Sequence, residues 1–354
     1  MAALIDLFAA GLMEKDVNSD VLWVWSYPVV TAKQRELIQR KGCLSTNNSA
    51  IVPYVYGQHN RQWFYIRTEE VNDAPALAKV KSFSLVLLTR DFNPEKYSLL
   101  SKILCQAYMT SGNPTSMLEH YLSVVTKGSC LSEDNGMFQV QDFDMRKAFA
   151  AASVKDVINK FEMESILIYT ALLLKKRIAV YHSKVEDLLH FVRALPCLVW
   201  HRQNWSLLYP YMDLESEDEI QELKSTSSYV AGFTNEAIES RTDLFDLFVN
   251  IPSAEITVAP NAKEYFAMGK LHKDIAQVMV SSAQDEAVSN KQTIVDISNK
   301  TMELINNLKS LSDSGPDGDG AGKVSIEALR ERKMPPATEN FLFSLAAAEG
   351  LAQV

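Results

Sequence analysis

The stretch that decides the fold runs from Ile166 to Pro196 and reads ILIYTALLLKKRIAVYHSKVEDLLHFVRALP. Its apolar beginning predicts a buried helix over Ile166–Leu174, and RIAVYH (Arg177–His182) predicts a buried strand. A further helix is expected over Leu188–Leu195, because the proline that follows cannot continue it. Helix, strand and helix in immediate succession indicate an α/β unit in which helices pack on a sheet.

The alternation continues toward the carboxyl end of this lobe. The further expected elements are strands at Trp205–Tyr209, Tyr229–Phe233 and Leu247–Ile251 and a short acidic helix at Glu215–Leu223. Pro210 is expected to stop the first of these strands, because proline cannot donate to a strand ladder. Strands that alternate with helices predict an α/β second lobe.

The first third of the chain is expected to form a sheet with helices packed against it. Strands are predicted at Val21–Tyr27, Gln62–Arg67 and Phe83–Thr89, which are rich in β-branched and aromatic residues. Helices are predicted after Thr31 and after Asn93, where the asparagine is the N-cap and a proline occupies the first helical position. The polar, turn-rich stretch 127–136 is the predicted boundary between the lobes.

From about Ala262 the sequence predicts one long helix. Apolar residues recur there in steps of three and four over more than four heptads, a spacing typical of a coiled-coil seam. The seam residues Ile294, Ile297, Leu304 and Leu308 are candidates for packing on a partner helix. The alternative, packing on the protein's own lobe, stays open. Residues 312–322 (SDSGPDGDGAG) are predicted to be a flexible linker, followed by a last apolar helix over Phe341–Leu351.

Composition limits the function classes. The chain has 354 residues, of which 47% are hydrophobic and 22% charged, so it is expected to be globular, with about two lobes. Its net charge of −9 argues against a nucleic-acid partner, because phosphate binding requires a basic surface. Four widely spaced cysteines, an apolar amino terminus without basic residues and no apolar run of membrane-spanning length predict a soluble cytosolic protein.

The motif search gives little that indicates an enzyme. The sequence contains no GxSxG, HExxH or GxGxxG motif, and its six histidines are scattered. An EF-hand loop in the Asp/Gly-rich linker does not close, because Val324 and Ala328 occupy the positions that require glutamate. His182 is better explained as a hydrogen-bonded core or turn residue, and the five tryptophans as core packing. No metal and no cofactor are expected.

Three segments together resemble the DENN domain family, whose members activate Rab GTPases by exchanging their nucleotide. Val21–Pro28 (VLWVWSYP) is similar to an early strand of the family that ends in a Trp-x-x-Tyr-Pro type corner. Ser82–Leu104 is similar to a strand, a Ser/Thr-Arg corner and the following helix, and Leu172–Thr234 is the most specific of the three. The order and spacing agree over about residues 1–310. The chain departs from the family at Asn250 and Pro252, where members often carry an Asp-x-Asp pair.

The resemblance implies an α/β, two-lobed DENN module with a longin-like amino-terminal lobe and a larger α/β carboxy-terminal lobe that ends in a long helix. Its expected parts are residues 1–130 (uDENN), 131–260 (cDENN) and 261–354 (dDENN-like). The implied function is guanine nucleotide exchange on a Rab-family small GTPase in endosomal or vesicular traffic, without covalent chemistry of its own. The alternative is a non-catalytic scaffold subunit of an endosomal sorting assembly that binds a coiled-coil partner.

The resemblance also implies where the GTPase binds, namely across the two lobes. The contact candidates are Ser26, Tyr27, Arg90, His182, Ser183, Tyr209 and Gly232. Contact with endosomal membranes is expected to be indirect, through the GTPase or an assembly, because the sequence has no polybasic segment for anionic lipid. The particular Rab is not readable from the sequence.

Overall fold

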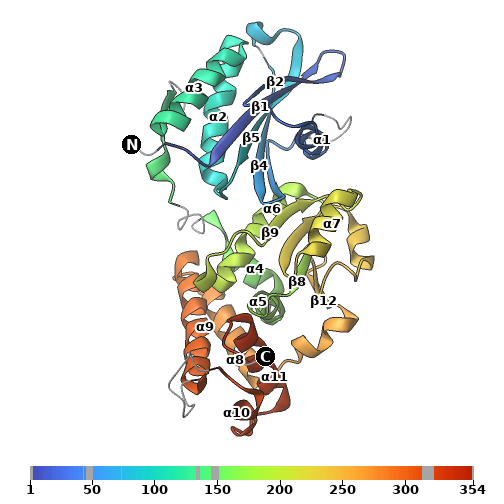
Figure 1. Ribbon diagram of the computed structural model, residues 1–354, viewed down its shortest axis with the longest axis vertical. Helices are drawn as coiled ribbons and strands as arrows, with labels where there is room; N and C mark the ends of the chain where they lie inside the picture. Colours follow the sequence, from blue (N-terminus) through green and yellow to red (C-terminus); the bar gives the residue numbers. More distant parts are fainter. Residues whose placement is uncertain are drawn as a thin grey trace. The chain divides into compact units, whose positions relative to one another are not determined.

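The computed structural model describes residues 3–42, 44, 51–72, 74–132, 136–144, 151–312 and 323–352. The chain forms two compact units, residues 1–148 and 149–354, which are drawn in Figure 1. The boundary that the sequence places at residue 130 lies in β6 (Ser129–Ser132), whose hairpin with β7 (Gly136–Gln139) belongs to the first unit. The finer three-part division stays a prediction, and residues 313–322 of the predicted linker lie outside the described residues.

The first unit is built on an antiparallel sheet with the strand order β2-β1-β5-β4-β3. The strands are β1 (Leu7–Asp16), β2 (Val21–Tyr27), β3 (Tyr54–His59), β4 (Gln62–Glu70) and β5 (Val80–Thr89). The predicted strand over residues 21–27 is confirmed at both ends. The central strand β5 is buried from Ser82 to Thr89, which its run of apolar residues predicts.

Three helices accompany this sheet: α1 (Ala32–Lys41), α2 (Pro94–Ser111) and α3 (Pro114–Lys127). Their starts follow the predicted caps, because Thr31 forms a capping box with Gln34, and Asn93 accepts a hydrogen bond from the Lys96 backbone. Figure 1 shows α2 and α3 together at one side of the sheet and α1 at the other. A 3₁₀ turn, η2 (Pro75–Leu77), precedes β5.

The second unit contains a sheet with the order β12-β11-β8-β10-β9. The strands are β8 (Arg177–Tyr181), β9 (Leu208–Met212), β10 (Tyr229–Phe233), β11 (Leu247–Asn250) and β12 (Glu255–Val258). All pairs are parallel except β11 with β12. The surrounding helices include α4 (Val154–Phe161), α5 (Ser165–Leu173), α6 (Val185–Ala194), η6 (Leu195–Arg202), α7 (Glu217–Ser225), η7 (Glu236–Ser240) and η8 (Pro260–Phe266). The predicted α/β layering is confirmed.

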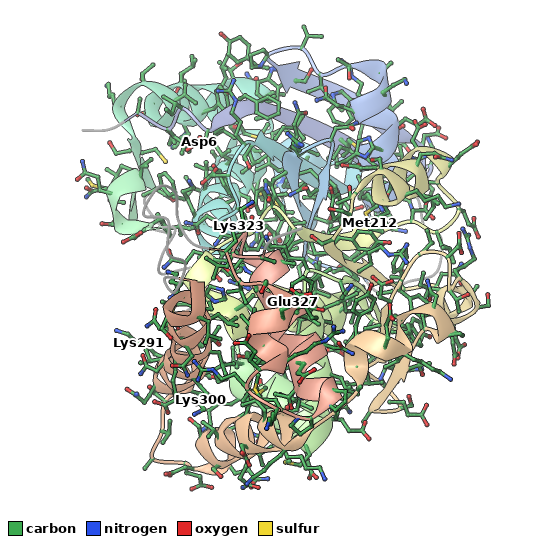
Figure 2. All side chains as sticks on the ribbon, turned by 60° about the horizontal axis from the view of Figure 1, so that its bottom comes forward. Asp6, Met212, Lys291, Lys300, Lys323 and Glu327 are labelled. Carbon is green, nitrogen blue, oxygen red and sulfur yellow. The ribbon has the colours of Figure 1, made fainter. Side chains whose placement is uncertain are left out.

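The prediction of a strand at Trp205–Tyr209 is wrong in its bounds, because the observed strand lies further along the chain. The observed strand β9 begins at Leu208 and continues through Pro210 to Met212, which Figure 2 labels. Proline is accommodated because β9 is an edge strand that pairs only with β10, so one of its sides makes no ladder bonds. Pro210 therefore lies within the strand and does not terminate it.

The prediction of a single long helix after Ala262 is also wrong. The chain forms α8 (Lys270–Gln284) and α9 (Asn290–Ser312), separated by a turn at Asp285–Ser289. The Asp285 carboxylate accepts a 2.9 Å bond from the Ala287 backbone, and the Ser289 hydroxyl accepts one from the Gln292 backbone. These bonds satisfy backbone donors at the break. Two further helices, α10 (Ile326–Arg330) and α11 (Pro336–Ala348), end the described chain.

Candidate functional site

The three candidates in the first unit lie at the same end of its sheet. In the ladder, Ser26 and Tyr27 pair with Gly11 and Ala10 at the beginning of β1. Thr89 pairs with Leu7, and the Arg90 backbone N–H donates a 2.9 Å bond to the Asp6 carbonyl oxygen. The beginning of β1 therefore lies between the ends of β2 and β5, although 63 residues separate Tyr27 from Arg90 in sequence.

Tyr27 and Arg90 present side chains at the surface of this unit. Tyr27 is 43% exposed, and the edge of its ring packs against Tyr121 of α3 with 5.9 Å between the ring centroids. Arg90 is exposed, and Ser26 is partly exposed. Tyrosine supported on one side by a buried aromatic residue presents a rigid, amphipathic surface, which suits a protein contact.

A buried polar network fixes the chain immediately after Arg90. The Asp91 carboxylate accepts hydrogen bonds from Lys96 Nζ and from the Tyr97 hydroxyl, and its carbonyl oxygen accepts one from Thr89. Burial, together with the adjacent Asp91 carboxylate, raises the pKa of Tyr97 far above its usual value. Lys96 lies in the first turn of α2, where a cation is unfavourable for the helix dipole, and Asp91 compensates its charge.

In the second unit His182 and Ser183 follow the carboxyl end of β8, the edge of a parallel sheet at which binding residues commonly gather. His182 Nδ1 accepts a 2.9 Å hydrogen bond from the Lys184 backbone, and its Nε2 lies 3.6 Å from an Asp187 carboxylate oxygen. His182 is therefore a hydrogen-bonded turn residue, one of the two roles expected for it. Ser183 is exposed beside it.

Tyr209 and Gly232 do not offer a contact surface. Tyr209 is 5% exposed and packs edge-on against Tyr229, and Gly232 is buried in β10. A Cβ atom on Gly232 would lie 2.3 Å from the Pro210 carbonyl oxygen, so the glycine permits a close approach of β9. Both residues support the sheet, and the surface candidates in this unit are His182 and Ser183.

The seam residues on α9 are buried by the protein's own second unit. Ile294, Ile297 and Leu308 are each 1% exposed, and Leu304 is 7% exposed. The Thr301 hydroxyl lies 2.8 Å from the Tyr169 hydroxyl of α5, within the same contact. Of the two alternatives that the sequence leaves open, the structure shows packing on the own lobe, because these side chains leave no free apolar stripe.

Features of catalytic or metal centres are scarce. Across the described residues no group of His, Cys, Asp and Glu side chains is arranged to hold a metal ion. Burial raises the pKa values of Cys105, Cys130 and Cys197, so these thiols stay protonated.

A cavity of about 220 Å³ lies between η8 and α11, next to Tyr265 and Phe341. Among the helices described, none combines the length and apolarity needed to span a membrane.

Comparisons with known proteins give first a family model and then similar proteins. Residues 151–260 match the family model described as SPA, stabilization of polarity axis. The chain is 51% identical to DENN domain-containing protein 10 of Danio rerio, over 98% of both proteins. It is 49% identical to the Homo sapiens protein of that name, over 98% of this chain and 97% of the relative, and 36% identical to the Dictyostelium discoideum one, over 96% of each.

The chain therefore belongs to the DENN domain family. Its fold is the two-lobed α/β arrangement expected from the resemblance, with the sheet β2-β1-β5-β4-β3 in one unit and β12-β11-β8-β10-β9 in the other. The three similar proteins from Danio rerio, Homo sapiens and Dictyostelium discoideum all carry the name DENN domain-containing protein 10.

Proposed function

We propose that the protein is a guanine nucleotide exchange factor for a Rab-family small GTPase. The observation that carries the proposal is its similarity, over nearly the whole chain, to DENN domain proteins, a family of mostly Rab exchange factors. The similarity covers both α/β units of the chain.

Exchange follows from differential binding and needs no nucleophile or general base. A GTPase that holds its nucleotide with a picomolar dissociation constant binds it with about −16 kcal/mol. A factor that binds the nucleotide-free form more tightly than the loaded form weakens nucleotide binding by the same factor. The contacts achieve this by holding the switch segments in an arrangement that no longer encloses phosphate and magnesium.

The surface candidates for these contacts are Ser26, Tyr27 and Arg90 on the first unit and His182 and Ser183 on the second. We place the activity in endosomal or vesicular traffic, where a cytosolic factor reaches the membrane through its lipid-anchored GTPase. The scaffold alternative remains, with a coiled-coil partner bound elsewhere than on the α9 seam, because the side chains of that seam are buried.

The test is release of a fluorescent GDP analogue from a panel of purified Rab GTPases, with the full-length chain at micromolar concentration. We expect one or a few members to release nucleotide faster with the protein than without it, and the responding member identifies the substrate. No acceleration of any member by protein shown to be folded would contradict the exchange function and make the scaffold role the leading hypothesis.

A further inference from the structure

Exposed cations gather at the end of the first sheet that carries Tyr27. Trp63 of β4 pairs with Thr89 of β5, so the next pair along the ladder brings Gln62 beside Arg90. Arg61 directly precedes Gln62, and both Arg61 and Arg90 are exposed. Arg61 and Arg90 therefore lie at neighbouring strand ends.

A third cation comes from α1. The Gln34 side chain donates a 3.0 Å hydrogen bond to the Gln62 side chain, which places the first turn of α1 near the same strand end. Lys33, the residue before Gln34, is exposed. We name Lys33, Arg61 and Arg90 the basic rim.

No acidic side chain among the described residues neutralises the basic rim through an ion pair. In the portion of the chain that the structure describes, none of the three cations takes part in an ion pair. Of the nearby carboxylates, Glu36 lies 3.7 Å from Arg40 and Asp91 binds Lys96, and the Asp6 side chain is partly buried and forms no ion pair with the rim among the described residues. A basic cluster on a chain of net charge −9 attracts an anionic partner by complementarity.

The backbone holds Arg61 in a conformation that arginine seldom adopts. Asn60 and Arg61 form the two-residue turn between β3 and β4 with φ angles of 51° and 60°. Such turns favour glycine at the second position, because a side chain at positive φ is strained. An arginine at this position costs stability that glycine would preserve, and such strain is common at functional sites.

Apolar side chains flank the basic rim and specify what kind of anionic partner fits. Ile5 is 75% exposed, Val29 is 84% exposed and Tyr27 is 43% exposed. Ile5 precedes Asp6, the residue whose carbonyl binds the Arg90 backbone and which Figure 2 labels. Arginine and tyrosine beside exposed aliphatic side chains are typical of a protein interface, so this composition favours an acidic protein surface over a free anion.

We propose that the basic rim, with Ile5, Tyr27 and Val29, binds a surface of the Rab GTPase that combines carboxylates with apolar side chains. This inference rests on the proposed function, because its partner is the same GTPase. The rim steers encounter through its charge, and the apolar side chains exclude water from the contact. The hydrogen bonds at Asp91 fix the residue next to Arg90 before the partner arrives.

The test compares the wild-type chain with the double variant Arg61→Gly and Arg90→Glu in the GDP-release assay, on the GTPase that responds to the wild type. We expect kcat/KM for exchange to fall about tenfold or more and to depend less on ionic strength. The melting temperature should not fall, because glycine relieves the strain at residue 61. Lys79→Glu, at the opposite end of β5, is the control and should leave exchange unchanged.

The remaining outcomes separate this inference from the proposed function. Unchanged exchange by a folded double variant overturns the basic rim and leaves the exchange function standing. No exchange by the wild type overturns both. Wild-type binding to phosphatidylserine vesicles that the double variant loses, with exchange unchanged, assigns the rim to a membrane and overturns the protein partner.

Discussion

Gly232 is a contact candidate whose position in the structure gives it a role in the packing of the sheet. It lies in β10 where the pairing with β9 shifts register, between Ala231 and Phe233. At this shift the Pro210 carbonyl turns toward the glycine, and a Cβ atom would lie only 2.3 Å from its oxygen. The obstacle is backbone, which cannot rotate away as the end of a flexible side chain does.

We therefore expect Gly232→Ala to destabilise the protein by about 1–3 kcal/mol, because the edge strand must shift to admit the methyl group. Urea unfolding measures the loss. Gly269→Ala is the matched control, since its nearest neighbour is the Thr338 hydroxyl at 3.3 Å, which can rotate. If Gly232→Ala were as stable as the wild type, the structural role would be contradicted and Gly232 would again be a candidate for contact with the GTPase.

Glu349 at the end of α11 attaches the last helix to η6. Its Oε1 accepts hydrogen bonds from His201 Nε2 at 3.2 Å and from Arg202 Nε at 3.1 Å. Arg202 also donates 2.7 Å bonds to the carbonyl oxygens of Leu172 and Leu173 at the end of α5. Burial alone would raise the pKa of Glu349, but the bonds from His201 and Arg202 lower it to about 2.

This lowered pKa predicts a dependence of stability on pH. Because the folded-state pKa of about 2 lies below the ordinary value of 4.5, the contact stabilises the protein fully above about pH 5. This contribution to stability is lost as the pH falls from 4.5 toward 2. Glu349→Gln should thus be less stable than the wild type at pH 7, with a difference that shrinks below pH 4.5 in urea unfolding. A difference independent of pH would show that the charge does not matter.

At the scale of elements, the seam on α9 gives a direct prediction. Ile297→Ala removes a side chain that is 1% exposed, so we expect a loss of about 2–5 kcal/mol in the free energy of unfolding. Val295→Asp is the control on the same helix, because Val295 is 38% exposed and a surface change costs about 0.5 kcal/mol or less. Equal stability of Ile297→Ala and the wild type would mean that α9 does not pack on its own unit.

The elements that sequence reasoning found are those with local signals. Neighbouring residues in the sequence determine the cap at Asn93 and the aromatic strand at Val21–Tyr27, and both predictions are confirmed. The break at Asp285–Ser289 contains neither glycine nor proline, so the apolar period continued through it in the sequence. The path of β9 through Pro210 depends on which strand forms the edge, a tertiary property that no local pattern reveals.

The candidate site shows the same difference between features with local sequence signals and features that depend on the tertiary structure. The corners after β2 and β5 are candidates because they lie in segments that resemble the DENN family, but the burial of Tyr209 emerges only when β9 and β10 pair. Arg61 was missed because it precedes a strand in a short turn, and its proximity to Arg90 follows from the pairing of β4 with β5. A search for exposed cations at the ends of paired strands finds it once the strand order is known.

At the scale of the whole molecule, the proposal requires both units to contact one GTPase. Tyr27 lies on the first unit and His182 on the second, and each has a partly exposed side chain. If the two side chains make contacts that do not influence each other, their effects on the activation free energy of exchange add.

We expect Tyr27→Ala and His182→Ala each to lower the rate of GDP release about tenfold, and the double variant to lower it about a hundredfold. The melting temperature should stay close to that of the wild type, since both side chains lie at the surface of their units. Leu131→Ala is the control, because this 66% exposed side chain lies on the β6–β7 hairpin and is not one of the contact candidates. A double variant no slower than one of the single variants would confine the contact to one unit, and a lowered melting temperature would assign the residues a structural role.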